Sequence, residues 1–430
     1  MERRSFLETL GGVAVSGAIG FASSPSAATD VSAWRRHFPA LRQQVNGQPL
    51  VYLDSAATTL RPNAMIEALA NFHRRDNANP GGALHTLARR SSRIHDDARR
   101  AVAEFINAHD PSEVVFTRGT TDGINLVAAS WGGANLRVDD EILIGVAEHA
   151  SNMVPWQMIA ARTGARVRYF DMLDSGHPSL EDLGSKLTLR TKVVAFSHVS
   201  NVLGMINPAK EMCALSKAVG RIVVVDAAQS VPHFPVDVRD LGCDFLAFSG
   251  HKMLGPMGIG VLWGRRELLD AMPPYQGGSN MAHEVDLESM HLSEGALKFG
   301  AGTPNVAGSV GLAAAIRFLN GIGHDAIWRH EQAITRHTLD RLTRIPSVRL
   351  IGATSPLEKI SVFAFGVRDR AALDVLSALD ARGIAVRAGD LASLPLLKRW
   401  RMTAAVRASC YVYTTLAEVD RLADALERIR

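Results

Sequence analysis

Ile222-Val223-Val224-Val225-Asp226-Ala227-Ala228-Gln229-Ser230 carries the clearest structural signal in this chain of 430 residues. The run of β-branched residues predicts a buried central strand, and Asp226 stands where that strand ends. Similar runs at Glu141–Val146 and Lys192–Phe196 alternate with helical patterns between Val51 and Gly264. This alternation is typical of an α/β fold in which helices cover both faces of a parallel sheet.

The pattern changes near Ser309. Ala-rich and Arg-rich helical segments follow, and then shorter strands such as Ile360–Phe365. We therefore expect a second, smaller α/β domain at the C-terminal end. The predicted division is a signal segment at 1–28, an N-terminal arm at 29–48, a large cofactor-binding domain at 49–308 and a small domain at 309–430.

Composition excludes several classes of protein. With 47% hydrophobic and 21% charged residues, the chain can bury more than one core. The net charge is only +4 and the basic residues are scattered, which disfavours a nucleic-acid partner and favours a small anionic cofactor. The three cysteines show no CxxC or metal-ligand spacing, so we predict no metal site and no disulfide framework.

The N-terminus has the order of a twin-arginine signal. Arg3-Arg4-Ser5-Phe6-Leu7 precedes a short apolar stretch, Leu10–Ala22, and the small residues Ser26-Ala27-Ala28. We expect the twin-arginine export machinery as a partner, cleavage after Ala28, no stable membrane anchor and a periplasmic location. If the segment is an amphipathic first helix instead, the protein stays in the cytoplasm.

Asp226 and Lys252 each stand at the end of a predicted buried strand. Lys252 follows Ser249-Gly250-His251 after a second buried run, Asp244–Phe248, where desolvation would lower the pKa of its amine. A carboxylate at Asp226 can pair with a protonated pyridine nitrogen, which keeps the ring an electron sink. A lysine that snorkels to the surface is the alternative interpretation. Because Asp226 and Lys252 occur together, we favour a pyridoxal 5′-phosphate site over a surface lysine.

A phosphate site is predicted at Arg118–Gly123, which leads into an apolar helix. Thr120, Thr121 and backbone N–H groups at a helix N-terminus suit a dianion, although these residues also suit simple capping. His149 follows another strand and could stack on the cofactor ring. No GxGxxG follows the first strand, which disfavours a dinucleotide enzyme.

Taken together, these blocks resemble the cysteine desulfurase and selenocysteine lyase group of the class V aminotransferases, in its sulfur-mobilising branch. The resemblance spans about residues 34 to 428. It rests on the blocks Tyr52–Ala57, Arg118–Asn125, Glu148–Asn152, His198–Gly204, Asp226–His233, Asp244–Gly260, Ala301–Asn305 and Arg407–Ser409. It implies fold type I, the aspartate aminotransferase-like fold, with a large, mostly parallel sheet of about seven strands and a smaller C-terminal α/β domain.

The resemblance also implies a role for each site residue. Lys252 would form the Schiff base with the cofactor, and Lys252 and His149 would be the catalytic residues. The other implied contacts are Asp226 with the ring nitrogen, Gln229 with the phenolic oxygen, His149 stacked on the ring, and Thr120, Thr121, Ser249 and His251 with the phosphate. Thr303 would reach the phosphate of a neighbouring subunit, which implies a homodimer. The substrate site would comprise Ala56, Asn201, Arg387 and Arg407, the last three on the substrate carboxylate.

One departure from the family concerns a thiol. Desulfurases of this branch carry a cysteine on the loop after an Arg-x-Gly block, and here Arg387-Ala388-Gly389-Asp390-Leu391-Ala392-Ser393 places Ala392 there. Ser393 cannot replace a thiolate at neutral pH. Cys410 should point away from Arg407, and Cys243 lies at the approach to a buried strand, so neither replaces the missing thiol. Ordinary cysteine desulfuration is therefore not expected.

A second departure lies at Asn79–His85, where the family has His and Arg beside the substrate. This chain has Gly81 and Gly82, which predicts a wider and less polar pocket.

Three functions follow as hypotheses. The first is a reaction at Cα of an amino-acid group, by transamination, decarboxylation or epimerisation, in a free amino acid or a larger small molecule. The second is β-elimination from a free amino acid, as in a selenocysteine lyase or a desulfurase-like lyase. The third is a binding protein with this fold and no catalysis.

Overall fold

The computed structural model describes residues 31–81 and 85–429. The predicted signal segment, its cleavage point and Gly82 lie outside the described residues.

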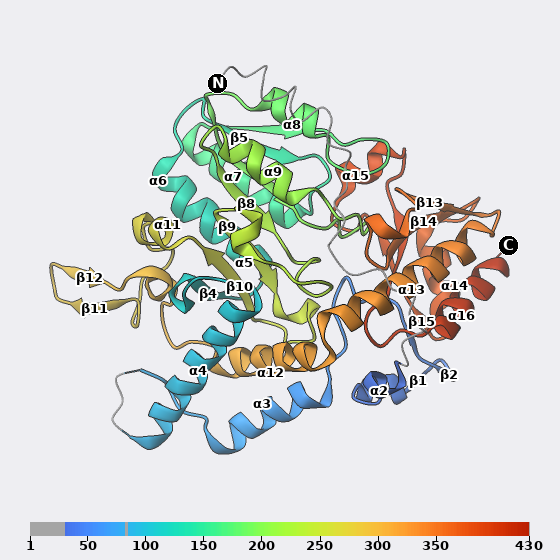
Figure 1. Cartoon of the computed structure of the whole chain (residues 1–430), viewed down its shortest axis with the longest axis horizontal. Helices are drawn as coiled ribbons and strands as arrows, with labels where there is room; N and C mark the ends of the chain where they lie inside the picture. Colours follow the sequence, from blue (N-terminus) through green and yellow to red (C-terminus); the bar gives the residue numbers. More distant parts are fainter. Residues whose placement is uncertain (1–30, 82–84, 430) are drawn as a thin grey trace.

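A seven-stranded sheet forms the centre of the larger part of the molecule (Figure 1). Neighbouring strands from β9 to β6 run parallel, whereas β10 runs antiparallel to both of its neighbours. In spatial order the strands are β4 (Val114–Thr117), β10 (Gly260–Gly264), β9 (Phe245–Ser249), β8 (Ile222–Asp226), β7 (Thr191–Ser197), β5 (Glu141–Gly145) and β6 (Arg166–Phe170). The predicted large, mostly parallel sheet is confirmed.

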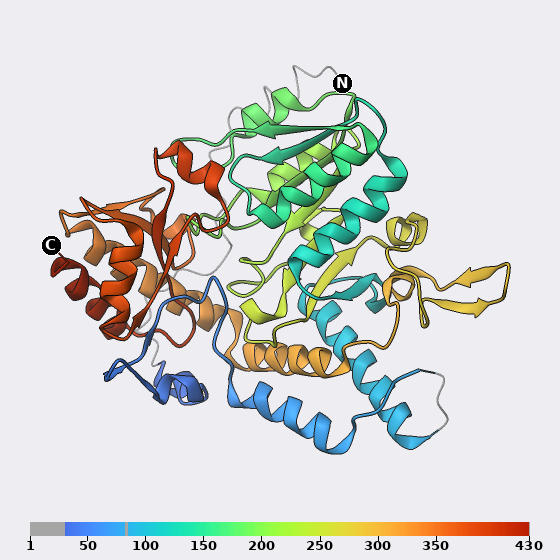
Figure 2. The ribbon, with the colours of Figure 1, turned by 180° about the vertical axis from the view of Figure 1, so that it is seen from behind.

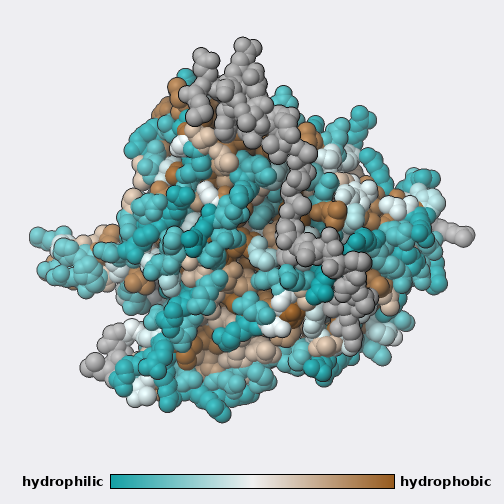
Figure 3. Space-filling model, in the orientation of Figure 1, coloured by the Kyte–Doolittle hydropathy of each residue, from teal (hydrophilic) through white to brown (hydrophobic). Residues whose placement is uncertain are grey.

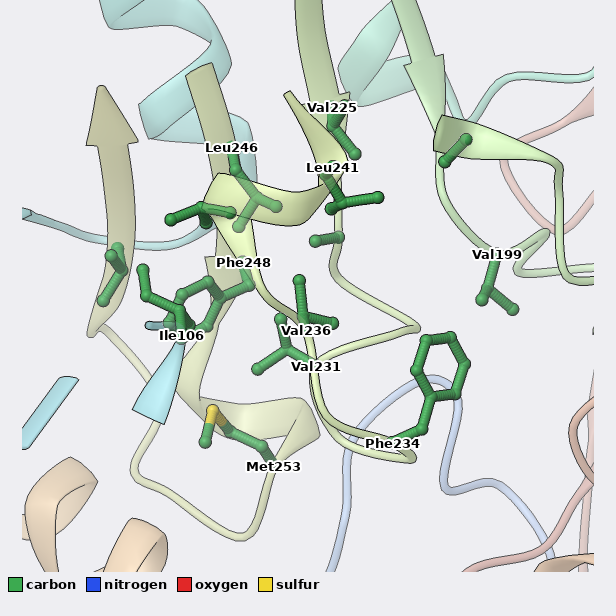
Figure 4. Close-up of a cluster of buried hydrophobic side chains, with 14 of the residues drawn as sticks. Ile106, Val199, Val225, Val231, Phe234, Val236, Leu241, Leu246, Phe248 and Met253 are labelled. Atoms are coloured by element: carbon green, nitrogen blue, oxygen red, sulfur yellow. The ribbon is translucent and has the colours of Figure 1, made fainter. Parts of the chain in front are cut away.

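Successive residues of the central strands pack into two hydrophobic layers. On β8, Val223 and Val225 belong to one layer and Val224 to the other. Figure 4 shows part of the first layer, in which Val225, Leu246 and Phe248 come from adjacent strands. Helices α9 (Ala209–Lys217) and α12 (Val306–Ile322) contribute to this layer, and α5 (Thr120–Val127) and α7 (Val154–Thr163) contribute to the second. Burial on both faces explains why these strands are continuous apolar runs.

A second sheet, antiparallel and four-stranded, forms the C-terminal part, drawn in orange and red in Figures 1 and 2. Its order is β13 (Val348–Leu350), β14 (Val362–Val367), β17 (Ala405–Ser409) and β16 (Arg387–Gly389). Helices α13 (His324–Thr343), α14 (Ala372–Asp380) and α16 (Leu416–Glu427) contribute to its hydrophobic core.

An early segment of the chain crosses to this second sheet. Strand β3 (Val51–Tyr52) pairs in parallel with β15 (Ile384–Ala385), and Asp54 forms a single bridge with Ser409. Because of this pairing, the residues that follow β3 lie between the two sheets and reach the site described below.

The remaining elements lie around these sheets. The helices are α2 (Ser32–Arg35), α3 (Asn63–Arg75), α4 (Thr86–Phe105), α6 (Gly133–Asn135), α8 (Leu180–Lys186), α10 (Val238–Leu241), α11 (Arg266–Ala271) and α15 (Leu394–Arg399). The single-turn elements are η1 (Pro39–Arg42), η2 (Pro111–Glu113), η3 (Ala128–Gly132), η4 (Ala150–Asn152), η5 (Gly250–Lys252), η6 (Gly295–Phe299) and η7 (Pro356–Glu358). Short hairpins join β1 (Gln44–Val45) to β2 (Gln48–Pro49) and β11 (Ala282–Val285) to β12 (Met290–Leu292).

Hydrophilic side chains predominate on the face shown in Figure 3, and hydrophobic ones appear in small areas between them. Within 31–81 and 85–429, no single helix is long and apolar enough to cross a membrane. Helices α12 and α13 meet that criterion only as a pair bent by 77°.

Lys359 is a buried cation that no carboxylate pairs with in the described part of the chain. It is 1% exposed, and its Nζ lies 4.6 Å from the centroid of the Phe363 ring. Burial lowers the pKa of Lys359 from 10.5 to about 7. Since the unfolded chain then binds the extra proton between these two pH values, stability should rise with pH across that window.

We expect Lys359→Met to raise the free energy of unfolding at pH 7 by on the order of 2 kcal/mol, because it removes a buried charge. Urea denaturation of wild type and variant measures the difference, which should shrink toward pH 10 as the wild-type amine and its unfolded counterpart approach the same protonation state. Exposed Lys398→Met is the control and should change little. A Lys359→Met protein that is less stable at pH 7 would contradict this account.

Candidate active site

The carboxyl ends of the central strands open into one pocket of about 480 Å³. Of the predicted site residues, all but Thr303 line it: Ala56, Thr120, Thr121, His149, Asn201, Asp226, Gln229, Ser249, His251, Lys252, Arg387 and Arg407. Parallel strands end at a shared edge, which is why residues more than a hundred positions apart meet here. Residues that the sequence analysis did not select as candidates also line the pocket: Ala57, Ser151, Ser197, Val199, Ala228, Ala388, Asp390 and Leu391.

Lys252 ends η5, immediately after β9, and faces this pocket. Burial lowers the pKa of its amine to about 8, against the opposing effect of the Asp226 carboxylate. At pH 7 an amine with this pKa is neutral in about a tenth of molecules, far more often than an ordinary lysine side chain. It therefore has the nucleophilicity that covalent attachment of an aldehyde cofactor requires.

Asp226 ends β8 and is 7% exposed. Its Oδ1 accepts a hydrogen bond from the Ala228 N–H at 2.9 Å. Burial raises the pKa of Asp226, and the positive charge of Lys252 opposes that rise. Next to it, Gln229 donates from Nε2 to the Ala56 carbonyl at 2.7 Å, which ties the loop after β8 to the segment after β3.

Hydroxyl groups gather at the N-terminus of α5. The Thr120 N–H donates to Ser249 Oγ at 2.8 Å, and the two hydroxyls of these residues lie 2.7 Å apart. Thr121 Oγ1 lies 2.8 Å from Ser151 Oγ. Gly260 permits this arrangement, since a Cβ there would come within 2.5 Å of Gly119 Cα. The result is a cluster of hydroxyl and N–H groups suited to a phosphate.

His149 precedes η4 and lines the pocket. Burial, with a smaller effect of Lys252, lowers the pKa of His149 to about 4, so the ring is neutral at physiological pH. Its Nδ1 accepts from the Ser151 N–H at 3.1 Å, which places the ring proton on Nε2. A neutral, oriented imidazole suits stacking on an aromatic cofactor.

These groups fit pyridoxal 5′-phosphate. Lys252 supplies the amine, and Asp226 supplies a buried carboxylate that faces the same pocket. The α5 N-terminus supplies hydroxyls that line the same pocket, and His149 supplies a flat neutral ring. Each group has the chemistry that one part of the cofactor requires.

The two arginines predicted to bind substrate form hydrogen bonds within the protein. Arg387 donates to Asp54 from both Nε and Nη2, the latter at 2.7 Å from Oδ2. Arg407 donates from Nη2 to Asp54 Oδ1 at 3.3 Å and from Nη1 to the Asn201 carbonyl at 2.9 Å. Asp54 was not among the site residues predicted from the sequence. Its position in the block Tyr52–Ala57 was the available signal.

The loop at Ala392 is held in place at the pocket wall. Asn201 Nδ2 donates to the Leu391 carbonyl at 2.9 Å, and the Ala150 N–H donates to the Ala392 carbonyl at 2.8 Å. Leu391 and Ala392 have φ values of 54° and 53°, in the left-handed region. Two adjacent non-glycine residues in this region need such support.

No cysteine lines this pocket among the residues that the structure describes. The cysteines of the chain, Cys213, Cys243 and Cys410, are all buried as free thiols. Burial raises the pKa of Cys213 to about 12 and the pKa values of the other two well above the usual range. These thiols are therefore protonated and enclosed, which are poor conditions for nucleophilic attack.

Thr303 is exposed and lies outside this pocket. Its predicted contact with the phosphate of a neighbouring subunit, and with it the homodimer, stays a prediction. Gly81 is described but does not line the pocket of its own chain.

Comparison with known proteins bears on this site. Residues 51–422 match the family model of class-V aminotransferases. The chain is 46% identical to a probable cysteine desulfurase of Halalkalibacterium halodurans over 92% of this chain and 97% of that protein. It is 43% identical to a cysteine desulfurase of Pectobacterium atrosepticum over the same shares of the two chains.

A solved structure agrees with these matches. The cysteine desulfurase CsdA of Escherichia coli superposes with a TM-score of 0.85 at 36% identity, covering 94% of this chain and 98% of that chain. This confirms the expected fold type I. The chain therefore belongs to the class-V aminotransferase family, among its cysteine desulfurase-like members, and is a pyridoxal-phosphate-dependent enzyme.

Proposed function

We propose that this enzyme is a lyase that breaks the bond between Cβ and a sulfur or selenium leaving group in a cysteine-type amino acid, without transferring that atom to a protein thiol. The observation that carries the proposal is Ala392 on the pocket wall, together with three cysteines that are all buried elsewhere. The desulfurase relatives favour chemistry at a cysteine-type side chain.

From the sequence alone, a reaction at Cα was the first hypothesis and β-elimination the second; here β-elimination comes first. The relatives support lyase chemistry and give no support to transamination, decarboxylation or epimerisation as the leading function. They also do not support the hypothesis of a binding protein without catalysis, because the matching relatives are named as cysteine desulfurases.

The site residues have distinct parts in this reaction. When bound, the cofactor serves as an electron sink for the charge left at the substrate Cα. Lys252, with its lowered pKa, is positioned to accept the Cα proton. Arg407, buried and at the pocket wall, binds the α-carboxylate.

The products follow from the bond that breaks. The leaving group departs from Cβ with its electron pair as a thiolate or selenolate. Water then releases the remaining three carbons as pyruvate and the nitrogen as ammonium. No external reductant is needed, so this reaction does not require the thiol that the site lacks.

A two-substrate assay tests the proposal. The cofactor-loaded enzyme is incubated with free cysteine or with an S-aryl cysteine, whose thiolate leaves more readily. We expect pyruvate and the aryl thiol in equal amounts from the second substrate, and very little sulfide from the first. Alanine formed from cysteine at a comparable rate would contradict the proposal, because it would show desulfuration.

Export by the twin-arginine route is a separate proposal, supported by the order of Arg3-Arg4, the apolar Leu10–Ala22 and Ala28. Replacing Arg3 and Arg4 with Lys should leave the precursor in the cytoplasm of a Gram-negative host, as measured by cell fractionation. Arg35→Lys is the control and should not change delivery. Unchanged periplasmic delivery of the Arg3/Arg4 variant would contradict the proposal.

A further inference from the structure

Asp54 is a carboxylate held between the two arginines of the pocket, and no part of the proposed reaction uses it directly. It follows β3 and is 8% exposed. Arg387 and Arg407 lie directly opposite each other on the paired strands β16 and β17. Asp54 contacts both guanidinium groups, at 2.7 Å and 3.3 Å.

The two arginines differ in how many of their hydrogen-bond donors are already paired. Arg387 uses Nε and Nη2 on Asp54, so one bidentate edge of its guanidinium is occupied and Nη2 is shared with the other edge. Arg407 is almost fully buried, and its Nε has no hydrogen-bond partner among the described residues. Arg407 is therefore the guanidinium with a buried donor still to satisfy.

The formal charges of Asp54, Arg387 and Arg407 sum to +1. Two guanidinium groups and one carboxylate leave a single net positive charge beside the pocket. One positive charge balances the α-carboxylate of a bound amino acid and leaves none for a second carboxylate. Asp390 on the same pocket forms no ion pair within the described residues and disfavours a second anion further.

We infer that Asp54 is a positioning residue that occupies Arg387, leaves Arg407 for the α-carboxylate, and so makes the enzyme select amino acids with a single carboxylate over dicarboxylic ones. This inference rests on the proposed function, because it names the substrate class of the same site. Asp54 acts through the arginines and does not itself line the pocket.

The test compares two ligands of nearly equal shape, L-asparagine and L-aspartate, which differ by one negative charge. Binding to the cofactor-loaded enzyme is followed by the change in visible absorbance, so turnover is not required. We expect wild type to bind asparagine at least about tenfold more tightly than aspartate, and Asp54→Asn to reduce that preference by about tenfold. The Asp54→Asn/Arg387→Gln double variant restores the net charge of one and should recover the wild-type preference.

Arg387→Gln alone is informative even where Asp54→Asn does not fold, because the Arg387 side chain is half exposed. It leaves Asp54 to neutralise Arg407, so asparagine should bind about tenfold more weakly. Arg368→Gln, at an exposed position after β14, is the matched control and should change neither affinity.

The outcomes separate this inference from the proposed function. An unchanged asparagine preference in Asp54→Asn, or equal weakening of both ligands with no recovery in the double variant, would overturn the selectivity role. A wild-type protein that binds the cofactor but neither amino acid would overturn this inference, whereas the proposed function fails only if an S-aryl cysteine gives no pyruvate.

Discussion

The Lys252→Ala protein is expected to lose the visible absorbance of the bound cofactor and at least about 10³-fold in turnover. Lys252 provides an amine that lines the pocket, and burial lowers its pKa to about 8. Alanine at this position removes both the covalent attachment and the group placed to move the Cα proton. The other pocket groups remain, so the variant should still bind the cofactor weakly and without a covalent bond.

Three measurements check this prediction. Absorbance spectra of the purified protein report the attached cofactor, and mass spectrometry after borohydride reduction locates it on the Lys252 peptide. Pyruvate formation from an S-aryl cysteine reports turnover. Lys192→Ala, on β7 and paired with Asp140 away from the pocket, should match wild type in all three. A reduced adduct on a lysine other than Lys252 would show that the site has been assigned wrongly.

The second large effect is expected with free cysteine. Wild type should form no protein persulfide from it. It should release sulfide from cysteine at least about 100-fold more slowly than it releases thiol from an S-aryl cysteine. Desulfuration needs a thiolate at the pocket. Ala392 stands where the resembled family has its cysteine, and its side chain has no nucleophilic group. All three cysteines are buried with raised pKa values. Sulfide measured with and without a reducing thiol, combined with a search for the adduct by mass spectrometry, gives the result.

Ala392→Cys should not restore desulfuration to the rate of thiol release. The loop is fixed by the hydrogen bonds from Asn201 and Ala150, and Leu391 and Ala392 both have positive φ. A thiol placed there would lack the freedom to approach the substrate and then turn away with the sulfur atom. Ala388→Cys, at another position that lines the pocket, is the matched control. Rapid sulfide release by wild type, with an adduct on Cys410, Cys243 or Cys213, would show that the nucleophile had moved within the chain.

Much of the fold and the cofactor site was predictable from local sequence. Val223, Val224 and Val225 form one apolar run because both faces of their strand are buried, and burial on both faces is what a central parallel strand requires. Asp226 and Lys252 then follow as neighbours, since each ends a strand and parallel strands end at one edge of the sheet. The same rule places His149 at this edge.

The substrate side of the pocket depended on contacts between distant segments. Asp54 lies 333 residues from Arg387 and 353 residues from Arg407, and no local pattern links them. They meet because β3, near the start of the described chain, pairs with β15 near its end. The register of β16 and β17 then sets the two arginines opposite each other. Propensity along the chain predicts that strands exist and how they end. Which strands pair, and in which register, is set by the packing of side chains over the whole molecule, and that packing determines which charges share this pocket.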